Sequence, residues 1–237
     1  MQMCRGGTCW VVMGASRVYL QVFSHRWCPV AREGEVMPRG GSSRGRARPK
    51  RSMARRVLVA TEGILTEPLY VEGLNSHLRA AGVAVTVQKV PVGRDPLKVV
   101  QKCIEFREKA KKSNKDFDIC VCLVDVDQHA SLASACSLAE EEGILLLISN
   151  LKFEVWLRWH AEDRSGALSS SQLDRLAEDL GLMREKRLSG TFPFDGVDSA
   201  CRIARRIDPE MKSARIGPNP SSALPLLVDI MRGIPSA

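Results

Sequence analysis

Short hydrophobic runs alternate with helix-length segments between residues 55 and 149, and this alternation limits the fold more than any other feature of the sequence. The runs are rich in β-branched residues and too short for buried helices, so each one predicts a strand. Strands that are separated by helices form a parallel sheet with helices on both faces. The sequence therefore predicts an α/β domain with a parallel sheet of about four strands. The four runs are RVLVA at 56–60, VAVTVQKV at 83–90, DICVCLVDVD at 118–127 and ILLLIS at 144–149.

Capping and breaking residues between these runs indicate the helix boundaries. Thr66 is a candidate N-cap, with Pro68 in the first turn of the helix that follows. Asp95 and Pro96 begin a second helix, and Gly143 ends a third. After the fourth strand the pattern is mainly helical, which predicts a helical C-terminal extension. Its expected helices are 153–161, 171–181, 195–207 and 221–232.

These patterns divide the chain into three parts. Residues 1–53 form a basic N-terminal extension, 54–161 the core, and 162–237 a helical C-terminal part of the same domain. Residues 1–52 carry ten Lys and Arg against two acidic residues, which accounts for the whole net charge of +8. The remaining chain has 25 basic and 25 acidic residues. The overall charge is therefore no argument that the domain itself binds nucleic acid.

The segment 31–52 is rich in Gly, Arg, Ser and Pro and cannot bury enough apolar area to order itself. We expect either a disordered tail or an extension upstream of a natural start at Met53. A basic arm that contacts RNA or DNA phosphates is the alternative.

Cysteine usage and hydropathy indicate the class of protein. The eight cysteines form no CxxC pair, so a structural zinc site has little support. We expect buried or incidental reduced thiols in a cytoplasmic protein. There is no segment of about 18 or more apolar residues and no clear secretory signal, so we expect no membrane span and no membrane partner.

Acidic side chains follow two of the predicted strands, at the edge where parallel strands present functional groups. Glu62 ends the first strand, and Asp125 and Asp127 end the third, where they point the same way if the strand stays extended. Crowded carboxylates repel one another and stay ionised when a cation lies among them. Such hard oxygen ligands suit Mg²⁺ or Mn²⁺. The alternative is that each acid caps a helix or faces solvent.

Four short motifs follow one another along the chain: EGILTEPLY at 62–70, DVDQH at 125–129, SNLKFEVWLRWH at 149–160 and NPSS at 219–222. Taken in this order they resemble the motifs of the RloB-like family of phage-defence proteins, over about residues 55–232. The acids after the first and third strands are also similar to those of the Toprim domain of topoisomerases, primases and overcoming-lysogenisation-defect nucleases. One departure is Leu151, which stands where the family has proline.

The resemblance implies a Toprim-like, Rossmannoid sheet and a metal-dependent nuclease. In such an enzyme Asp125 and Asp127 hold Mg²⁺ (or Mn²⁺), and Glu62 either binds the metal or acts as the base that activates water. The implied setting is antiphage defence by abortive infection, with an RloA-like AAA/ABC-type ATPase as partner. The substrate is nucleic acid; whether it is tRNA, other RNA or DNA stays open, as does the formation of a homo-oligomer.

The third motif adds two residues to the candidate site. Glu154 lies just past the fourth strand, where it either supplies a fourth metal-binding or water-positioning carboxylate or pairs with Arg158 at i+4. His160 follows Phe153 and Trp156 at helical spacing, as a core-facing histidine does. We therefore expect His160 to have a packing role.

Three further polar residues have two interpretations each. His129 closely follows the Asp-x-Asp pair, so it is either an acid or phosphate ligand or a polar residue at a helix start. Lys186, in a basic cluster with Arg184 and Arg187, either contacts substrate phosphates or lies in a solvated loop. Glu67 is expected to stabilise the helix dipole, with fixing the Glu62 loop as the weaker option.

Two other functions stay open. In a non-catalytic subunit of an ATPase complex the acids would bind a regulatory metal or shape an interface, and the neutral charge of residues 53–237 favours this modestly. A haloacid-dehalogenase-like phosphatase would use Asp125 as nucleophile and Asp127 as acid. That alternative is weaker, because its Asp-x-Asp belongs on the first strand and Glu62 would have no role.

Overall fold

The computed structural model describes residues 54–79, 82–89, 95–126 and 130–234, all within the compact unit Lys50–Ala237. The predictions for residues 1–53, for Asp127 and for His129 lie outside these residues. Among the described residues, no helix is long and apolar enough to cross a membrane.

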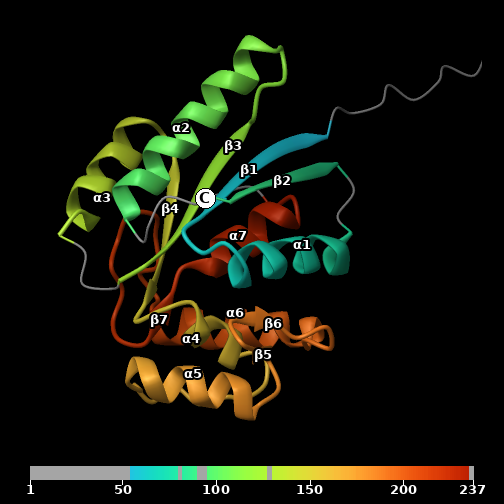
Figure 1. The fold of residues 1–237 in the computed structure, drawn as a ribbon, viewed down its shortest axis with the longest axis vertical. Coiled ribbons are helices and arrows are strands. Elements are labelled where there is room, and N and C mark those ends of the chain that lie inside the picture. The colour runs from blue at the N-terminus through green and yellow to red at the C-terminus, as the bar shows by residue number, and fades with distance from the viewer. Residues whose placement is uncertain (1–53, 80–81, 90–94, 127–129, 235–237) are drawn as a thin grey trace, which may run out of the picture. The chain divides into compact units, whose positions relative to one another are not determined.

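A five-stranded sheet forms the centre of the domain (Figure 1). Its strand order is β2-β1-β3-β4-β7; the four long strands run parallel, and the short β7 pairs antiparallel with the end of β4. The predicted α/β fold with about four parallel strands is confirmed, and β7 is an addition that the sequence did not predict. The strands are β1 (Arg55–Thr61), β2 (Val83–Lys89), β3 (Ile119–Asp125), β4 (Leu145–Asn150) and β7 (Ser221–Ser222).

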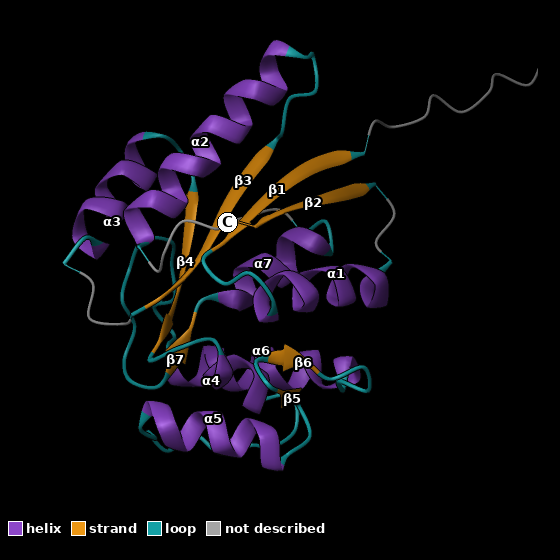
Figure 2. Ribbon diagram, viewed as in Figure 1, coloured by secondary structure: helices purple, strands orange, loops and turns teal. Residues whose placement is uncertain are grey.

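Helices cover both faces of the sheet (Figure 2), so the strands bury side chains on both sides. Successive strand residues point to opposite faces. Leu58 therefore lies in one core with Val99 of α2, while Val59 lies in a second core with Leu74 of α1 and Leu227 of α7. Helices α2 (Pro96–Lys112) and α3 (Leu132–Glu141) contribute to the core of Leu58. Helices α1 (Thr66–Leu78) and α7 (Leu224–Met231) contribute to the core of Val59.

The C-terminal part packs into the same core as α1. The chain after β4 contains the four expected helices with shorter bounds, and a two-stranded hairpin, β5–β6, that the sequence did not predict. The remaining elements are α4 (Glu154–Arg158), α5 (Ser170–Asp179), β5 (Met183–Arg184), β6 (Arg187–Leu188), the 3₁₀ helix η1 (Phe194–Gly196) and α6 (Val197–Ile207).

The starts of α1 and α2 test the capping predictions. Helix α2 begins at Pro96 as expected, and the Asp95 carboxylate accepts a backbone N–H of the first turn (3.1 Å). Helix α1 begins at Thr66 itself, with Leu65 in the N-cap position. The Thr66 hydroxyl donates instead to the carbonyl oxygen of Lys186 (2.7 Å). The N-cap prediction for Thr66 was wrong, because its hydroxyl forms a hydrogen bond with a distant segment and not with the first turn of α1.

The five described cysteines are free thiols, and four of them are buried. Cys103 of α2 packs with Cys120 and Cys122 of β3 in one of the two cores. The expectation of reduced, buried thiols is confirmed for this part of the chain.

Candidate functional site

Glu62 and Asp125 meet at the carboxyl edge of the sheet. Strands β1 and β3 are neighbours, with Thr61 opposite Leu123. The Glu62 N–H donates to the carbonyl oxygen of Leu123 (3.2 Å), and the Asp125 N–H donates to Oε2 of Glu62 (3.4 Å). Two acids that lie 63 positions apart in the sequence are therefore neighbours in space.

The carboxyl group of Asp125 is crowded by other carboxyl groups. Burial raises its pKa well above the ordinary value, and the charges of Glu67, Glu154 and Glu62 raise it further. The backbone N–H of Phe153 opposes this rise by donating to the Asp125 carboxylate. Such an arrangement favours a cation among the carboxylates. We refer to Glu62, Glu67, Asp125 and Glu154 as the carboxylate cluster.

Glu67 joins this cluster from the first turn of α1. Burial raises its pKa to about 7, and the charges of Glu154 and Glu62 contribute to the rise. Its carboxylate folds over Gly63 and accepts the Gly63 N–H. A Cβ at residue 63 would collide with the carboxylate of Glu67, so any larger residue there would displace that side chain from the loop. Glu67 therefore fixes the loop that carries Glu62, which from sequence was the weaker option.

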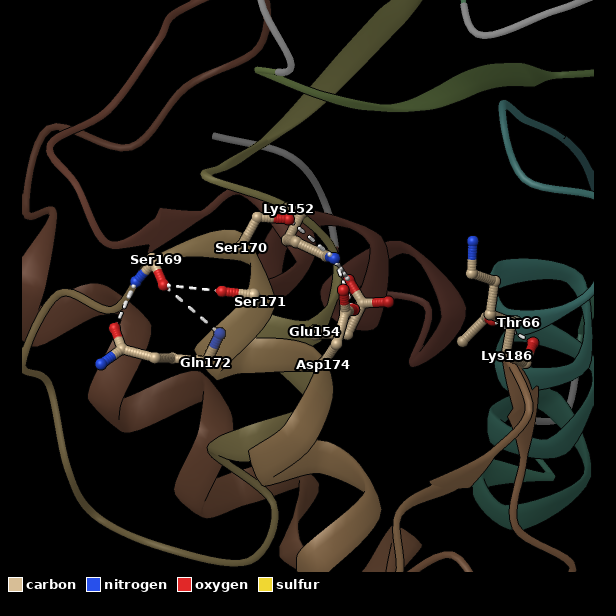
Figure 3. A network of polar contacts seen from close by, with 9 residues as sticks. All are labelled: Thr66, Lys152, Glu154, Ser169, Ser170, Ser171, Gln172, Asp174 and Lys186. Carbon is tan, nitrogen blue, oxygen red and sulfur yellow. Dashed lines mark hydrogen bonds and ion pairs between the residues drawn. The ribbon is translucent and has the colours of Figure 1, made fainter.

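Glu154, the first residue of α4, has a lysine beside it. The Lys152 ammonium lies 3.8 Å from the Glu154 carboxylate, 2.5 Å from that of Asp174 and 3.2 Å from the Ser170 hydroxyl (Figure 3). The side chains of Lys152 and Glu154 are only 14% and 13% exposed, so solvent screens this pair little. Burial raises the pKa of Glu154, and the charge of Lys152 opposes the rise.

The alternative pairing of Glu154 with Arg158 is wrong. Arg158 is buried and donates to Oε1 of Glu162 (2.5 Å) and to the carbonyl oxygen of Gly166 (3.1 Å). The guanidinium thus stabilises the chain after α4, and Lys152 supplies the positive charge next to Glu154.

The tip of the β5–β6 hairpin brings Lys186 to the same region. Its carbonyl oxygen accepts the Thr66 hydroxyl, as Figure 3 shows, and Thr66 is the neighbour of Glu67 in the sequence. Burial raises the pKa of Glu154, and the Lys186 ammonium is one of the charges that oppose this rise. The predicted phosphate contact therefore lies beside the carboxylate cluster.

Aromatic residues of the first and third motifs form a cluster with two phenylalanines from outside the motifs, Phe192 and Phe194. His160 is 7% exposed; its Nε2 lies 3.1 Å from the Tyr70 hydroxyl and its Nδ1 lies 3.1 Å from the Trp156 carbonyl oxygen. Burial lowers the pKa of His160 to about 4, so the ring is neutral at pH 7. The expected packing role of His160 is confirmed. The cluster consists of Tyr70, Phe153, Trp156, His160, Phe192 and Phe194.

The structure brings together Glu62, Asp125, Glu154 and Lys186 of the predicted site. Within the described residues, which leave out Asp127 and His129, no three His, Cys, Asp or Glu side chains form a group that could hold a metal ion. The metal site therefore stays a prediction.

Sequence reasoning missed Lys152 and placed Glu67 outside the site. Lys152 had a weak signal, since it lies two residues before Glu154 within the third motif. Its second partner, Asp174, had none, because it belongs to another helix, 22 positions away.

Comparison with known proteins places these residues in a family. The sequence model described as RloB-like protein matches residues 57–231, which includes every member of both clusters. A comparison with curated proteins gave no match. At the position where the resembling motif has proline, the peptide bond between Asn150 and Leu151 is cis.

Proposed function

The chain belongs to the RloB-like family, and we propose that it is a Mg²⁺-dependent phosphodiester hydrolase, a nuclease of the Toprim type. The observation that supports this proposal is the convergence of the carboxylate cluster at the carboxyl edge of a parallel sheet. Ligands of open α/β sheets bind at this edge. The cluster draws its acids from segments that follow three different strands, so it is a product of the fold rather than of one acidic stretch.

The cluster fits Mg²⁺ or Mn²⁺ by the chemistry of its donors. All four groups are carboxylates, the hard oxygen ligands that these ions take. Burial and mutual repulsion raise the pKa of Asp125, and a cation would relieve both effects. Glu62, Asp125 and Asp127 are the residues that would hold it. When bound, the ion polarises a phosphate group and stabilises charge on the leaving oxygen.

The other residues have positioning and binding roles in this proposal. The contact between Glu67 and Gly63 holds the loop of Glu62, whose carboxylate binds the ion or accepts a proton from water. The charge of Lys152 favours the ionised form of Glu154, whose carboxylate would orient that water molecule. Lys186 lies where it can contact a substrate phosphate.

Cleavage assays with the purified full-length chain test the proposal. Fluorescent tRNA, other RNA and DNA are incubated with the protein in Mg²⁺ or Mn²⁺, and product formation is measured. We expect Asp125→Asn and Glu62→Gln each to lower the cleavage rate by about 100-fold or more. Asp116→Asn is the matched control, because Asp116 is exposed and precedes β3 at the opposite edge of the sheet. Equal cleavage by all four proteins would sink the site assignment.

A second candidate is a non-catalytic subunit of an ATPase complex. It is favoured by the lack of a ready-made group of three metal-binding side chains among the described residues. Calorimetric titration with Mn²⁺ tests the first candidate, because the hydrolase requires binding at millimolar metal that Asp125→Asn weakens, and absence of binding would argue against catalysis. For either candidate we propose antiphage defence with an AAA/ABC-type ATPase as the setting, on family membership alone.

A further inference from the structure

The β5–β6 hairpin has two features that are unfavourable by themselves. Its turn residues, Glu185 and Lys186, both have positive φ, at 50° and 59°. Turns with two such residues normally contain Asn and Gly. Arg184 and Arg187 lie directly opposite each other in the hairpin ladder. Like charges in this arrangement destabilise a strand pair.

The other side of the hairpin is an ordinary packed surface. Met183 is buried, and its cross-strand partner Leu188 packs against the core. Because neighbouring strand residues point to opposite faces, Arg184 and Arg187 point away from the core, and both are exposed. Glu178 borders the same surface hollow as Arg184. However, no ion pair joins either guanidinium to an acidic side chain in the described part of the chain.

The hairpin is anchored next to the carboxylate cluster. The Thr66 hydroxyl donates to the Lys186 carbonyl oxygen at 2.7 Å (Figure 3). The next residue along α1 is Glu67. The two arginines flank the turn that contains Lys186 and pair with each other in the ladder. The hairpin whose turn contacts the start of α1 therefore carries three cations and one acid, Glu185, within four residues, whereas the domain as a whole is formally neutral.

We infer that Arg184 and Arg187 together bind the phosphate backbone of a nucleic-acid strand beside the carboxylate cluster. Guanidinium groups form paired, charge-assisted hydrogen bonds to phosphate oxygens, so one phosphate between them offsets their mutual repulsion. Such binding rests on the proposed hydrolase function, which places a phosphodiester of the same strand at the cluster. RNA and DNA share this chemistry.

Binding of nucleic acid to the full-length protein in EDTA tests this role without cleavage. Fluorescence anisotropy is measured with single-stranded RNA and DNA of one sequence at several KCl concentrations. The variant Arg184→Gln/Arg187→Gln is compared with Lys111→Gln/Lys112→Gln, which removes the same charge from exposed residues at the end of α2. The basic extension 1–52 is present in all proteins and contributes equally.

We expect the arginine variant to bind roughly ten-fold more weakly at low salt. Loss of the phosphate that the two arginines share lowers the slope of log K against log salt by about 0.7, the value per neutralised phosphate for single strands. The lysine variant should change affinity less than about two-fold. Hydrogen exchange should show protection of the hairpin by the nucleic acid, which binding by the extension alone would not produce. The RNA and DNA arms identify the preferred strand.

Three outcomes would overturn the inference: no binding by the unaltered chain, equal loss in both variants, or a hairpin without protection. Removing a like-charged pair should leave the melting temperature unchanged or higher, so a fall would assign the arginines a structural role instead. Failure of the hydrolase is a separate result. If the protein binds nucleic acid through the hairpin but never cleaves it, only the hydrolase proposal is refuted. If the protein cleaves nucleic acid and the arginine variant has an unchanged KM, only the role of the hairpin is refuted.

Discussion

The carboxylate cluster and the aromatic cluster share two of the short motifs but have opposite energetics. One motif gives Glu67 to the first cluster and Tyr70 to the second, and another gives Glu154 and His160. In the aromatic cluster both nitrogens of His160 have partners at 3.1 Å. In the carboxylate cluster burial and like charges raise the pKa values. A motif can thus combine residues that build the fold with residues that oppose it, and function is to be sought among the latter.

This contrast predicts the largest effect for a truncation in the aromatic cluster. Trp156 is fully buried, so Trp156→Ala leaves a large cavity and should lower the free energy of unfolding by about 3–5 kcal/mol. Urea denaturation measures the change. Ile64→Ala, at an exposed side chain near the carboxylate cluster, should change it by less than about 0.5 kcal/mol. Similar values for the two variants would contradict a stabilising aromatic cluster.

The second prediction concerns the contribution of His160 to stability at acid pH. The pKa of His160 falls from 6.5 to about 4 on burial, so the folded state binds fewer protons than the unfolded state between these values. Its contribution to stability is full above pH 6.5 and is lost as the pH falls to 4, a change of about 3 kcal/mol. Denaturation of the unaltered chain and of His160→Phe across this range gives the difference. A difference that does not vary with pH would mean that His160 is not held neutral.

The third prediction concerns Glu67, whose effect on stability changes with pH in the opposite direction to that of His160. The pKa of Glu67 rises from 4.5 to about 7, so its contribution favours folding below pH 4.5 and is lost as the pH rises through 7. In EDTA, Glu67→Gln should therefore be more stable than the unaltered chain above pH 7, by up to about 3 kcal/mol, and not below pH 4.5. Thermal melting at several pH values measures this. A loss of stability at high pH would show that the bond to Gly63 outweighs the repulsion.

The smallest expected effect is at Lys152. Its partner Asp174 is 47% exposed, which limits the strength of the ion pair, so Lys152→Gln should lower stability by about 0.5–1 kcal/mol. Lys102→Gln is the control, because Lys102 pairs with Glu105 and their side chains are 38% and 62% exposed. The two melting temperatures are compared. An equal shift in both would mean that burial adds nothing to the Lys152 pair.

The sheet was predictable because its strands repeat a strong local signal. The stretch 119–124 is continuous and apolar, a composition typical of a strand that is buried on both faces. The strand ends then located Glu62 and Asp125. Glu67 was harder to place, because its side chain turns back over Gly63, which the position of Glu67 in a helix does not reveal.

The contacts that complete the site were not predictable from local pattern. Strands of two residues, such as Met183–Arg184, are too short to have a period. The partners of Thr66 and Lys152 come from other elements, 120 and 22 positions along the chain. Such contacts depend on the packed structure, whereas helix and strand patterns depend on neighbours in the sequence.

The hydrogen bond between Thr66 and Lys186 joins a segment of the site that is synthesised early to one that is synthesised much later. A ribosome releases the chain from its N-terminus, so all four carboxylates emerge before the hairpin that carries Arg184, Lys186 and Arg187. Asp174, the second partner of Lys152, also follows them. A nascent or prematurely terminated chain therefore carries the acidic half of the site without the basic hairpin that adjoins it.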